Sequence, residues 1–222
     1  MKIKKACLND LSRVREFYYD LIDRTPDMGK YAQWKKDIHP DDTDLERYLN
    51  DDAMYMLIDD GRDIGKTDVD KTCAGRAEDG KTCIGQNDAA KIYAGQSVAE
   101  KKSCGQQADE KIAGMMAVEL MQDEEYRGIS WQIEASDSEV AEVHLLAVSP
   151  DHQKQGVGRH LIEEAQSIAR SNGKKALRLD AIETNTPAQH MYESGGFRYS
   201  GRQRLYAGNT GWIEFLYYEY LL

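Results

Sequence analysis

The stretch from residue 143 to residue 171 constrains the fold more than any other part of the chain. Val143 to Val148 is an apolar run that ends at Ser149-Pro150, as expected for a buried strand. A polar stretch with two glycines, Gln153 to Arg159, comes next, and an amphipathic helical pattern follows until Ser171-Asn172-Gly173. The apolar positions on one face of this helix are Val157, Leu161, Ala165 and Ile168. A strand that leads through a glycine loop into a helix indicates an α/β protein.

The glycine loop predicts a binding site for a pyrophosphate group. Backbone N–H groups at a helix N-terminus point toward one place, and the helix dipole adds positive potential there. Gly156 and Gly158 allow close approach of the phosphates, and Lys154 and Arg159 can add positive charge around them. The loop is neither the three-glycine dinucleotide fingerprint nor a P-loop, which needs Gly-Lys-Ser/Thr.

A second feature is a ten-residue repeat between residues 61 and 110. Glycine recurs at positions 65, 75, 85, 95 and 105, and lysine at positions 71, 81, 91, 101 and 111. Ten residues are too few for a helix pair but suit one turn of a narrow β-solenoid, and a ladder of hairpins is the alternative. We therefore expect a β-rich appendage that is structural or that binds an unknown partner.

The sequence on both sides of the repeat reads as one domain. Setting aside residues 61–110 leaves 172 of the 222 residues, in two parts, 1–60 and 111–222. Met54 to Asp59 and Lys111 to Val118 have the pattern of two strands of a hairpin, so the insert is expected between strands two and three, where insertions cost little. The other expected elements are a helix from Asn9-Asp10 to near Pro26, a strand at Ala176 to Ala181, a short helix from near Pro187, and strands at Phe197 to Tyr199 and Trp212 to Tyr220.

Composition excludes several classes of function. The formal net charge of −10 opposes attraction to nucleic acid or to anionic lipid, and no apolar run reaches the roughly 20 residues of a membrane span. The basic N-terminus lacks the apolar stretch of a secretion signal, so a cytoplasmic location is expected. The four cysteines do not form C-x-x-C pairs, and we expect no metal site.

Two motifs together resemble the GNAT superfamily of N-acyltransferases. The first is Gln153-x-x-Gly156-x-Gly158 after the apolar strand, which is similar to the family's acetyl-coenzyme A loop. The second runs from Asn185 to Gly196-Phe197 and is similar to the family's C-terminal helix motif. The resemblance covers the chain outside the repeat. It implies a mixed, mostly antiparallel sheet flanked by helices, which splays between its fourth and fifth strands to admit the cofactor.

The resemblance also implies roles for individual residues. The family's strand segment, which binds the pantetheine arm, matches Leu146, Ala147 and Val148. The pyrophosphate loop matches Gln153, Lys154, Gln155, Gly156, Val157, Gly158 and Arg159, and the cofactor contact of the second motif matches Asn185. Tyr192 matches the position that protonates the departing thiolate, and a backbone N–H near Val148 would hold the oxyanion. The co-substrate would be acetyl-coenzyme A (acetyl-CoA), with no metal.

The identity of the general base stays open at this stage. An amine must lose a proton before it attacks a thioester, and Glu142 and His144 share one face of their strand. Either residue, or neither, is the base, and Tyr18, Tyr19, Trp34 and Tyr206 are candidate aromatics of the acceptor pocket. We expect an N-acetyltransferase that acts on a small-molecule amine or a peptide by direct attack in a ternary complex. The alternative is a non-catalytic acyl-CoA-binding or interaction module, and the sequence leaves a homodimer open.

Overall fold

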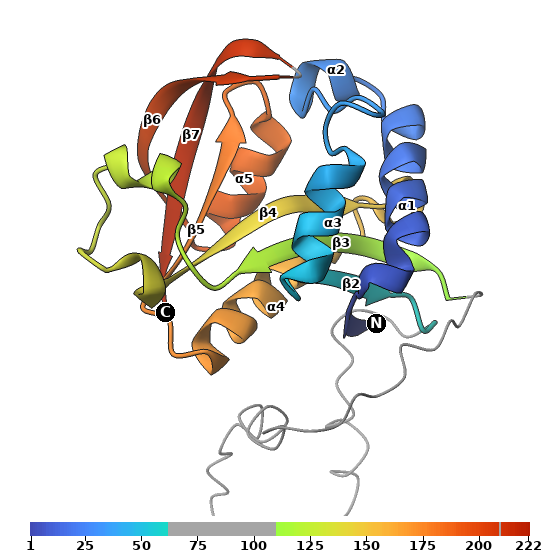
Figure 1. The fold of residues 1–222 in the computed structure, drawn as a ribbon, viewed down its shortest axis with the longest axis horizontal. Coiled ribbons are helices and arrows are strands. Elements are labelled where there is room, and N and C mark those ends of the chain that lie inside the picture. The colour runs from blue at the N-terminus through green and yellow to red at the C-terminus, as the bar shows by residue number, and fades with distance from the viewer. Residues whose placement is uncertain (62–109, 209) are drawn as a thin grey trace, which may run out of the picture.

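The computed structural model describes residues 1–61, 110–208 and 210–222. The expected ten-residue repeat, and with it the choice between a β-solenoid and a hairpin ladder, lies outside these residues. The described part of the chain forms one seven-stranded sheet with helices on both faces (Figure 1).

The sheet is mixed and mostly antiparallel. Its order is β1-β2-β3-β4-β5-β7-β6, and all neighbouring strands are antiparallel except β4 and β5. The strands are β1 (Lys2–Lys5), β2 (Met54–Ile58), β3 (Ile112–Glu119), β4 (Val140–Val148), β5 (Ala176–Ile182), β6 (Arg198–Ala207) and β7 (Gly211–Leu221).

The helices divide between the two faces of the sheet. The α-helices are α1 (Leu11–Arg24), α2 (Met28–Tyr31), α3 (Asp42–Asn50), α4 (Val157–Ser171) and α5 (Thr186–Ser194). Apolar residues of α4 and α5 form one core with β3, β4 and β5, whereas α1 and α3 form a second core with β2 and β3 (Figure 1). Short 3₁₀ turns lie at Leu8–Asp10, Glu124–Gly128, Asp137–Glu139 and Pro150–His152.

The two parallel strands separate part-way along their length. β4 and β5 pair only from Val140–Val143 to Ala176–Leu179, so the β5-facing backbone edge of β4 is unpaired from residue 144 onward. Pairing of β3 with β4 is irregular nearby, and Leu145 has a φ of +50°. The hydroxyl of Tyr18 on α1 donates to the carbonyl of Leu145 at 2.7 Å and supports this bulge.

The glycine loop leads into α4 through a left-handed residue. Gly156 is the N-cap of α4 with a φ of +84°, a conformation that glycine adopts without steric cost. Under the same helix, a Cβ at Gly114 of β3 would lie 2.8 Å from Leu161 Cδ1 and 2.9 Å from the carbonyl oxygen of Ala147. A glycine is therefore needed for α4 to pack closely against β3 and β4.

Most of the elements expected from the sequence are confirmed. The splayed mixed sheet, the helix after Asn9-Asp10, and α4 are present, and β2 and β3 pair as the two strands that flank the expected insert. The sequence pattern assigned no residues to the first strand, β1, and did not predict helices α2 and α3, and β6 is longer than the run from Phe197 to Tyr199. None of the helices in the described ranges is long and apolar enough to cross a bilayer.

Candidate active site

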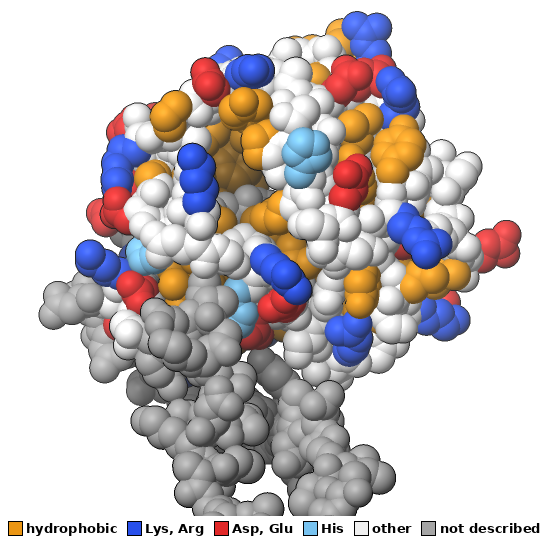
Figure 2. Space-filling model, turned by 180° about the vertical axis from the view of Figure 1, so that it is seen from behind, with side chains coloured by type: hydrophobic (Ala, Val, Ile, Leu, Met, Phe, Trp, Pro, Cys, Tyr) orange, Lys and Arg blue, Asp and Glu red, His pale blue; other side chains and the backbone are white. Residues whose placement is uncertain are grey.

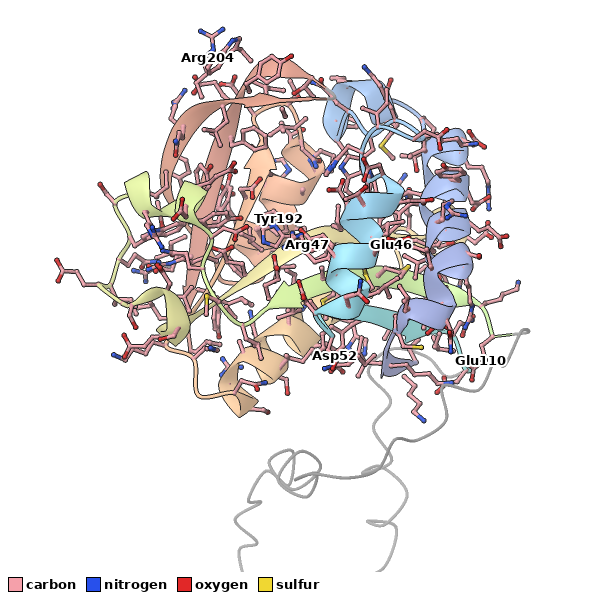
Figure 3. All side chains as sticks on the ribbon, viewed as in Figure 1. Glu46, Arg47, Asp52, Glu110, Tyr192 and Arg204 are labelled. Carbon is pink, nitrogen blue, oxygen red and sulfur yellow. The ribbon has the colours of Figure 1, made fainter. Side chains whose placement is uncertain are left out.

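A cavity of about 600 Å³ lies where β4 and β5 separate. Its lining comes from both faces of the sheet: Tyr192 and Met191 of α5 on one side, and Trp34, Tyr48 and Tyr126 on the other. Figure 3 labels Tyr192 of α5 and Arg47 of α3 near the middle of the molecule, and both residues line the cavity. Viewed from behind, the surface is hollowed, with hydrophobic side chains inside the hollow (Figure 2). A volume of this size is typical of sites for small ligands.

The cofactor-loop residues lie together at the N-terminus of α4. Gln153, Lys154, Gln155, Gly156 and Arg159 are exposed, whereas Val157 is buried under the helix. The first intrahelical bond is from His160 N–H to the Gly156 carbonyl, so the preceding N–H groups of the first turn have no intrahelical acceptor. The loop therefore offers several backbone donors and the positive side chain of Lys154 to an anion, next to Arg159, which pairs with Glu163 at 2.9 Å.

Glycine is needed at the two loop positions for different structural reasons. Gly156 needs its positive φ, and no atom lies within 4 Å of the place where its Cβ would be. A Cβ at Gly158 would lie 2.4 Å from Met191 Sδ, so this glycine also allows α4 to approach α5. The sequence suggested only the need for phosphate approach.

The remaining predicted cofactor contacts lie along the unpaired edge of β4 and at the start of α5. Leu146 lines the cavity, whereas Ala147 is buried in the core beneath α1. Val148 is half-buried, so it and Ala147 can contribute through their backbone. The side chain of Asn185 caps α5 by accepting from Ala188 N–H at 3.4 Å, and Asn185 also lines the cavity.

Tyr192 is a buried residue of α5 that lines the cavity. Its ring makes edge-on and tilted contacts with Tyr218 and Phe197, at centroid distances of 5.8 Å and 6.1 Å. Its hydroxyl forms no hydrogen bond with any described residue. Burial, together with the nearby charge of Asp180, raises the pKa of Tyr192 well above its usual value, so the phenol keeps its proton.

Glu142 and His144 share one face of β4, as expected, but differ in access to the cavity. His144 lines the cavity, whereas Glu142 lies behind it and is fully buried. His144 Nε2 is 3.3 Å from a carboxylate oxygen of Glu142 and 3.3 Å from one of Glu119. Both oxygens of Glu142 accept from the backbone N–H of Asp123 at 3.2 Å. An acceptor in the cavity can therefore reach His144 but not Glu142.

The environment of this pair raises the pKa of both groups. Burial raises the pKa of Glu142 to about 7, and the hydrogen bond with His144 opposes part of that rise. For His144, burial lowers the pKa, but the hydrogen bond and charge of Glu142, with the charges of Asp180 and Glu119, raise it overall. Perturbed titratable groups of this kind are common at catalytic sites.

Glu119, Asp123 and His144 have ligand types found in metal sites. Their donor atoms lie within 4.8 Å of one another, although the sequence predicted no metal site. Glu119 already pairs with Arg47 at 2.6 Å, and His144 with Glu142. We therefore treat the three residues as part of the polar wall around His144.

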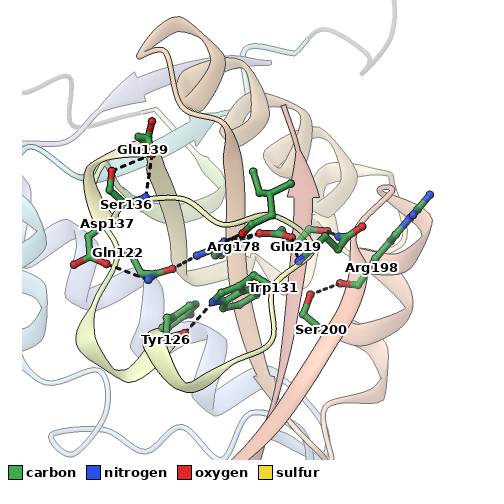
Figure 4. Close-up of polar contacts among 12 residues, drawn as sticks. Gln122, Tyr126, Trp131, Ser136, Asp137, Glu139, Arg178, Arg198, Ser200 and Glu219 are labelled. Carbon is green, nitrogen blue, oxygen red and sulfur yellow. Dashed lines mark hydrogen bonds and ion pairs between the residues drawn. The ribbon is translucent and has the colours of Figure 1, made fainter.

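A buried polar network holds the segment from residue 120 to 139 over this face of the sheet (Figure 4). The guanidinium of Arg178 on β5 donates to Glu219 on β7 at 2.8 Å, to the Gln122 side chain, and to the Ile133 carbonyl at 3.2 Å. It also stacks on Trp131, 4.1 Å from the ring centroid. Because the same segment supplies Asp123 and Tyr126 to the cavity, the network positions part of the cavity wall.

Among the predicted acceptor aromatics, only Trp34 lines the cavity. Tyr18 is buried and supports Leu145, Tyr19 hydrogen-bonds Asp37, and Tyr206 contacts Trp212. Sequence reasoning missed several lining residues, among them Arg47, Tyr48, Tyr126 and Asp180. Arg178 and Asp180 alternate with apolar residues in β5, and this pattern of polar residues on one face of a buried strand was a signal for Asp180.

The cavity carries an excess of negative side chains. Its lining includes one arginine, Arg47, and two histidines, His39 and His144. Against these stand five carboxylates, Asp41, Asp44, Asp123, Glu125 and Asp180. The lining is therefore suited to a ligand with positive charge.

Comparison with known proteins agrees with this arrangement. The model of the acetyltransferase (GNAT) family matches residues 96–197. A GNAT-family acetyltransferase from Streptococcus agalactiae superposes with a TM-score of 0.60 at 16% identity, over 100% of this chain and 95% of that one. The fold is that of the GNAT acetyltransferases. NAA60 of Arabidopsis thaliana, solved with a bisubstrate analogue, has a TM-score of 0.59 at 14% identity over 100% of this chain and 98% of its own. The resemblance predicted from the sequence is confirmed to this extent.

Curated relatives match over a shorter stretch. Streptothricin acetyltransferase of Streptomyces lavendulae is 36% identical over 66 residues, which are 29% of this chain and 35% of that protein. Ribosomal protein bS18-alanine N-acetyltransferase of Escherichia coli K12 is 37% identical over 65 residues, 29% of this chain and 44% of that protein. The chain thus covers less than half the length of these curated relatives. YncA of Salmonella typhimurium, solved with acetyl-CoA, superposes with a TM-score of 0.54 at 14% identity over 100% of this chain and 94% of its own.

Proposed function

We propose that the protein is an N-acetyltransferase that moves an acetyl group from acetyl-CoA to an amine of a small molecule or peptide in a ternary complex. The observation that carries this proposal is the cavity at the separation of β4 and β5. It joins Tyr192 and Asn185 on the α5 face to His144 and the acidic wall on the other face. A thioester and an amine that enter from opposite faces would meet there.

The residues present fit acetyl-CoA on three counts. The free N–H groups at the start of α4, with Lys154 and Arg159 beside them, are suited to a pyrophosphate. The unpaired edge of β4 from residue 144 to 148 offers backbone groups to an amide-containing arm. Asn185 and Tyr192 line the cavity beyond that edge. When bound, acetyl-CoA would supply an activated acetyl thioester.

The polar residues of the cavity account for the proton transfers. His144 lies at the cavity surface and takes the proton from the incoming amine at Nδ1, because its Nε2 faces Glu142, which stabilises the imidazolium that forms. Tyr192 Oη donates a proton to the departing sulfur, because the phenol is protonated at neutral pH and has no competing partner among the described residues. We thus assign His144 as the base and Glu142 as the residue that orients it.

The alternative, a non-catalytic acyl-CoA-binding or interaction module, is less well supported. A protein that only binds acyl-CoA needs the loop at the start of α4. It does not need the buried pair of Glu142 and His144 on the acceptor side of the cavity. Such a pair costs stability, because burial raises the pKa of Glu142. Catalysis explains why it is present.

The remaining sequence predictions stay predictions. The division into an acyltransferase domain, residues 1–60 and 111–222, and a repeat insert at 61–110 belongs to this proposal. A cytoplasmic location, a homodimer and an unknown partner for the insert are further expectations that the described residues do not test.

The proposal is tested by steady-state acetyl transfer with a panel of amines, together with calorimetric measurement of acetyl-CoA affinity. Tyr192→Phe should lower kcat by about 10²-fold, and His144→Gln should lower it by a similar factor, because each removes one proton-transfer group. Acetyl-CoA affinity should stay within about threefold in both variants. An enzyme whose turnover was unchanged in both variants would contradict the assigned roles. Cofactor binding without any turnover would favour the alternative.

A further inference from the structure

Asp180 is a cavity carboxylate that the proposed mechanism does not use. It follows the last β5 residue paired with β4, Leu179, so it stands at the point where the two strands separate. On the strand it shares a face with Arg178, and it lines the cavity together with His144 and Tyr192. Its side chain is half-buried, because it borders the cavity.

The carboxylate of Asp180 has a neutral partner but no cationic side chain paired with it. Oδ1 accepts a hydrogen bond from the Tyr126 hydroxyl at 2.5 Å, and Oδ2 has no hydrogen-bond partner in the described part of the chain. No lysine or arginine of the described residues forms an ion pair with it, whereas the fully buried Glu219 on the neighbouring strand β7 pairs with Arg178 at 2.7 Å. A carboxylate in a low-dielectric site without a cation is costly unless a ligand provides the positive charge.

The groups around Asp180 place it beside both candidate proton-transfer residues. Its charge contributes to raising the pKa of His144 and of Tyr192, so it lies within electrostatic reach of both. Tyr126, which holds Oδ1, is fixed by a stacked contact with Trp131 and edge-on contacts with Tyr217 and His144. One carboxylate oxygen of Asp180 is therefore held by a well-packed tyrosine, and the residue lines the same cavity as the proposed base and acid.

Aromatic faces complete this part of the cavity. Tyr48 and Tyr126 line it next to His144, at ring-centroid distances from the imidazole of 5.9 Å and 6.1 Å. The Arg47 guanidinium already lies over the Tyr48 ring, 4.1 Å from its centroid, and Trp131 stacks on Tyr126, so these rings form the wall of the site. The carboxylate of Asp180 is the group that offers a charge-assisted hydrogen bond, and it favours an ammonium ion over a neutral amine.

We propose that Asp180 binds the ammonium form of the acceptor directly and selects strongly basic aliphatic primary amines over weakly basic aromatic amines. This inference rests on the proposed function and names its substrate class. Bound as R–NH₃⁺, the acceptor gives one proton to neutral His144, and its nitrogen lone pair then forms the new N–C bond to the acetyl carbon as the C–S bond breaks. The sulfur leaves with the proton from Tyr192. The second nitrogen proton passes through water to the Tyr192 phenolate, His144 releases its proton to solvent, and Asp180 is unchanged at the end.

The test compares cyclohexylamine with aniline, which have nearly the same size but differ in charge at neutral pH. In Asp180→Asn, KM for cyclohexylamine should rise about 10- to 100-fold, because a charge-assisted hydrogen bond is lost, while KM for aniline should stay within twofold. Asp180→Glu, which keeps the carboxylate, should recover part of the loss. Asp20→Asn removes the same charge from an exposed position on α1 outside the cavity and should change neither KM.

A binding measurement separates failure of this inference from failure of the proposed function. The CoA-loaded protein is titrated with cyclohexylammonium chloride, and the wild type should bind it about 10-fold or more tightly than Asp180→Asn. If no amine is acetylated but this difference appears, the proposed function fails and the cation site stands. If amines are acetylated and Asp180→Asn changes both KM values equally or neither, the inference is overturned and the function stands. The inference is also overturned if the CoA-loaded wild type binds no cyclohexylammonium and acetylates neither amine. If Asp180→Asn does not fold, the same comparison with Asp180→Glu decides, because only the KM for cyclohexylamine should change.

Discussion

Replacing Glu142 with glutamine tests the electrostatic account of the site through folding stability. Glu142 is fully buried on β4, and burial raises its pKa from 4.5 to about 7. Glutamine has nearly the same shape and can still accept from the backbone N–H of Asp123. The substitution therefore removes the ionisation and keeps most of the packing.

The sign of the effect follows from the direction of the pKa change. Below pH 4.5 the carboxyl is protonated in both the folded and the unfolded protein, and its full contribution to stability is present. Between 4.5 and about 7 the unfolded chain ionises but the folded protein does not, so stability is lost as the pH rises. Because one pKa unit corresponds to 1.36 kcal/mol, a rise from 4.5 to about 7 corresponds to a loss of about 3 kcal/mol.

The assay is urea unfolding of the wild type and Glu142→Gln at a series of pH values from 4.5 to 8. The free energy of unfolding of the variant, relative to the wild type, should increase by about 3 kcal/mol across this range. Glu139→Gln is the matched control, because Glu139 is paired with Lys175 and its pKa is lowered to about 2 in the folded protein, so above about pH 5.5 it is ionised in both the folded and the unfolded protein. Parallel pH profiles for wild type and Glu142→Gln would refute the raised pKa of Glu142 behind His144.

Three further substitutions test the architecture. Gly156→Ala should lower the free energy of unfolding by about 1 kcal/mol, or about 2–4 °C in Tm, because its φ of +84° disfavours alanine. Gly29→Ala in α2 is the control and should not destabilise the protein, because Gly29 also has open space around it but no positive φ. Gly114→Ala should cost about 1–3 kcal/mol in urea unfolding, because the new methyl group meets Leu161 and the Ala147 carbonyl, and an unchanged midpoint would show that α4 can move away. Arg178→Met should cost about 3–5 kcal/mol because it leaves Glu219 buried without a cation, and a variant as stable as the wild type in the same assay would show that the network contributes little.

Local patterns in the sequence were sufficient for the elements that position the cofactor loop. The apolar run of β4, the glycines after it and the helical repeat of α4 each depend on neighbouring residues, so their order along the chain predicted their arrangement in space. The separation of β4 from β5 came from the family resemblance, since nothing in either strand alone shows where pairing stops. The short strand β1 and helix α3 have patterns too brief for recognition, and tertiary packing stabilises them.

The acceptor side of the site was largely beyond prediction from the sequence. Arg47 and Tyr48 come from α3, Tyr126 from the segment after β3, and Asp180 from β5, so only the three-dimensional fold brings them together. The bulge at Leu145, which has a positive φ without being glycine, had no local signal either. By contrast, the strand alternation of Glu142 and His144 was enough to place both on one face, although it could not show which of them reaches the cavity.

The most direct test of the central claim is calorimetric titration of the purified protein with acetyl-CoA. The account predicts one-to-one binding with a dissociation constant of about micromolar order, weakened about 10-fold or more when Gly156 and Gly158 are replaced by valine, because these positions shape the N-terminus of α4. The absence of binding at millimolar acetyl-CoA would contradict it, because the chain would then have the fold without the site on which every proposed step depends.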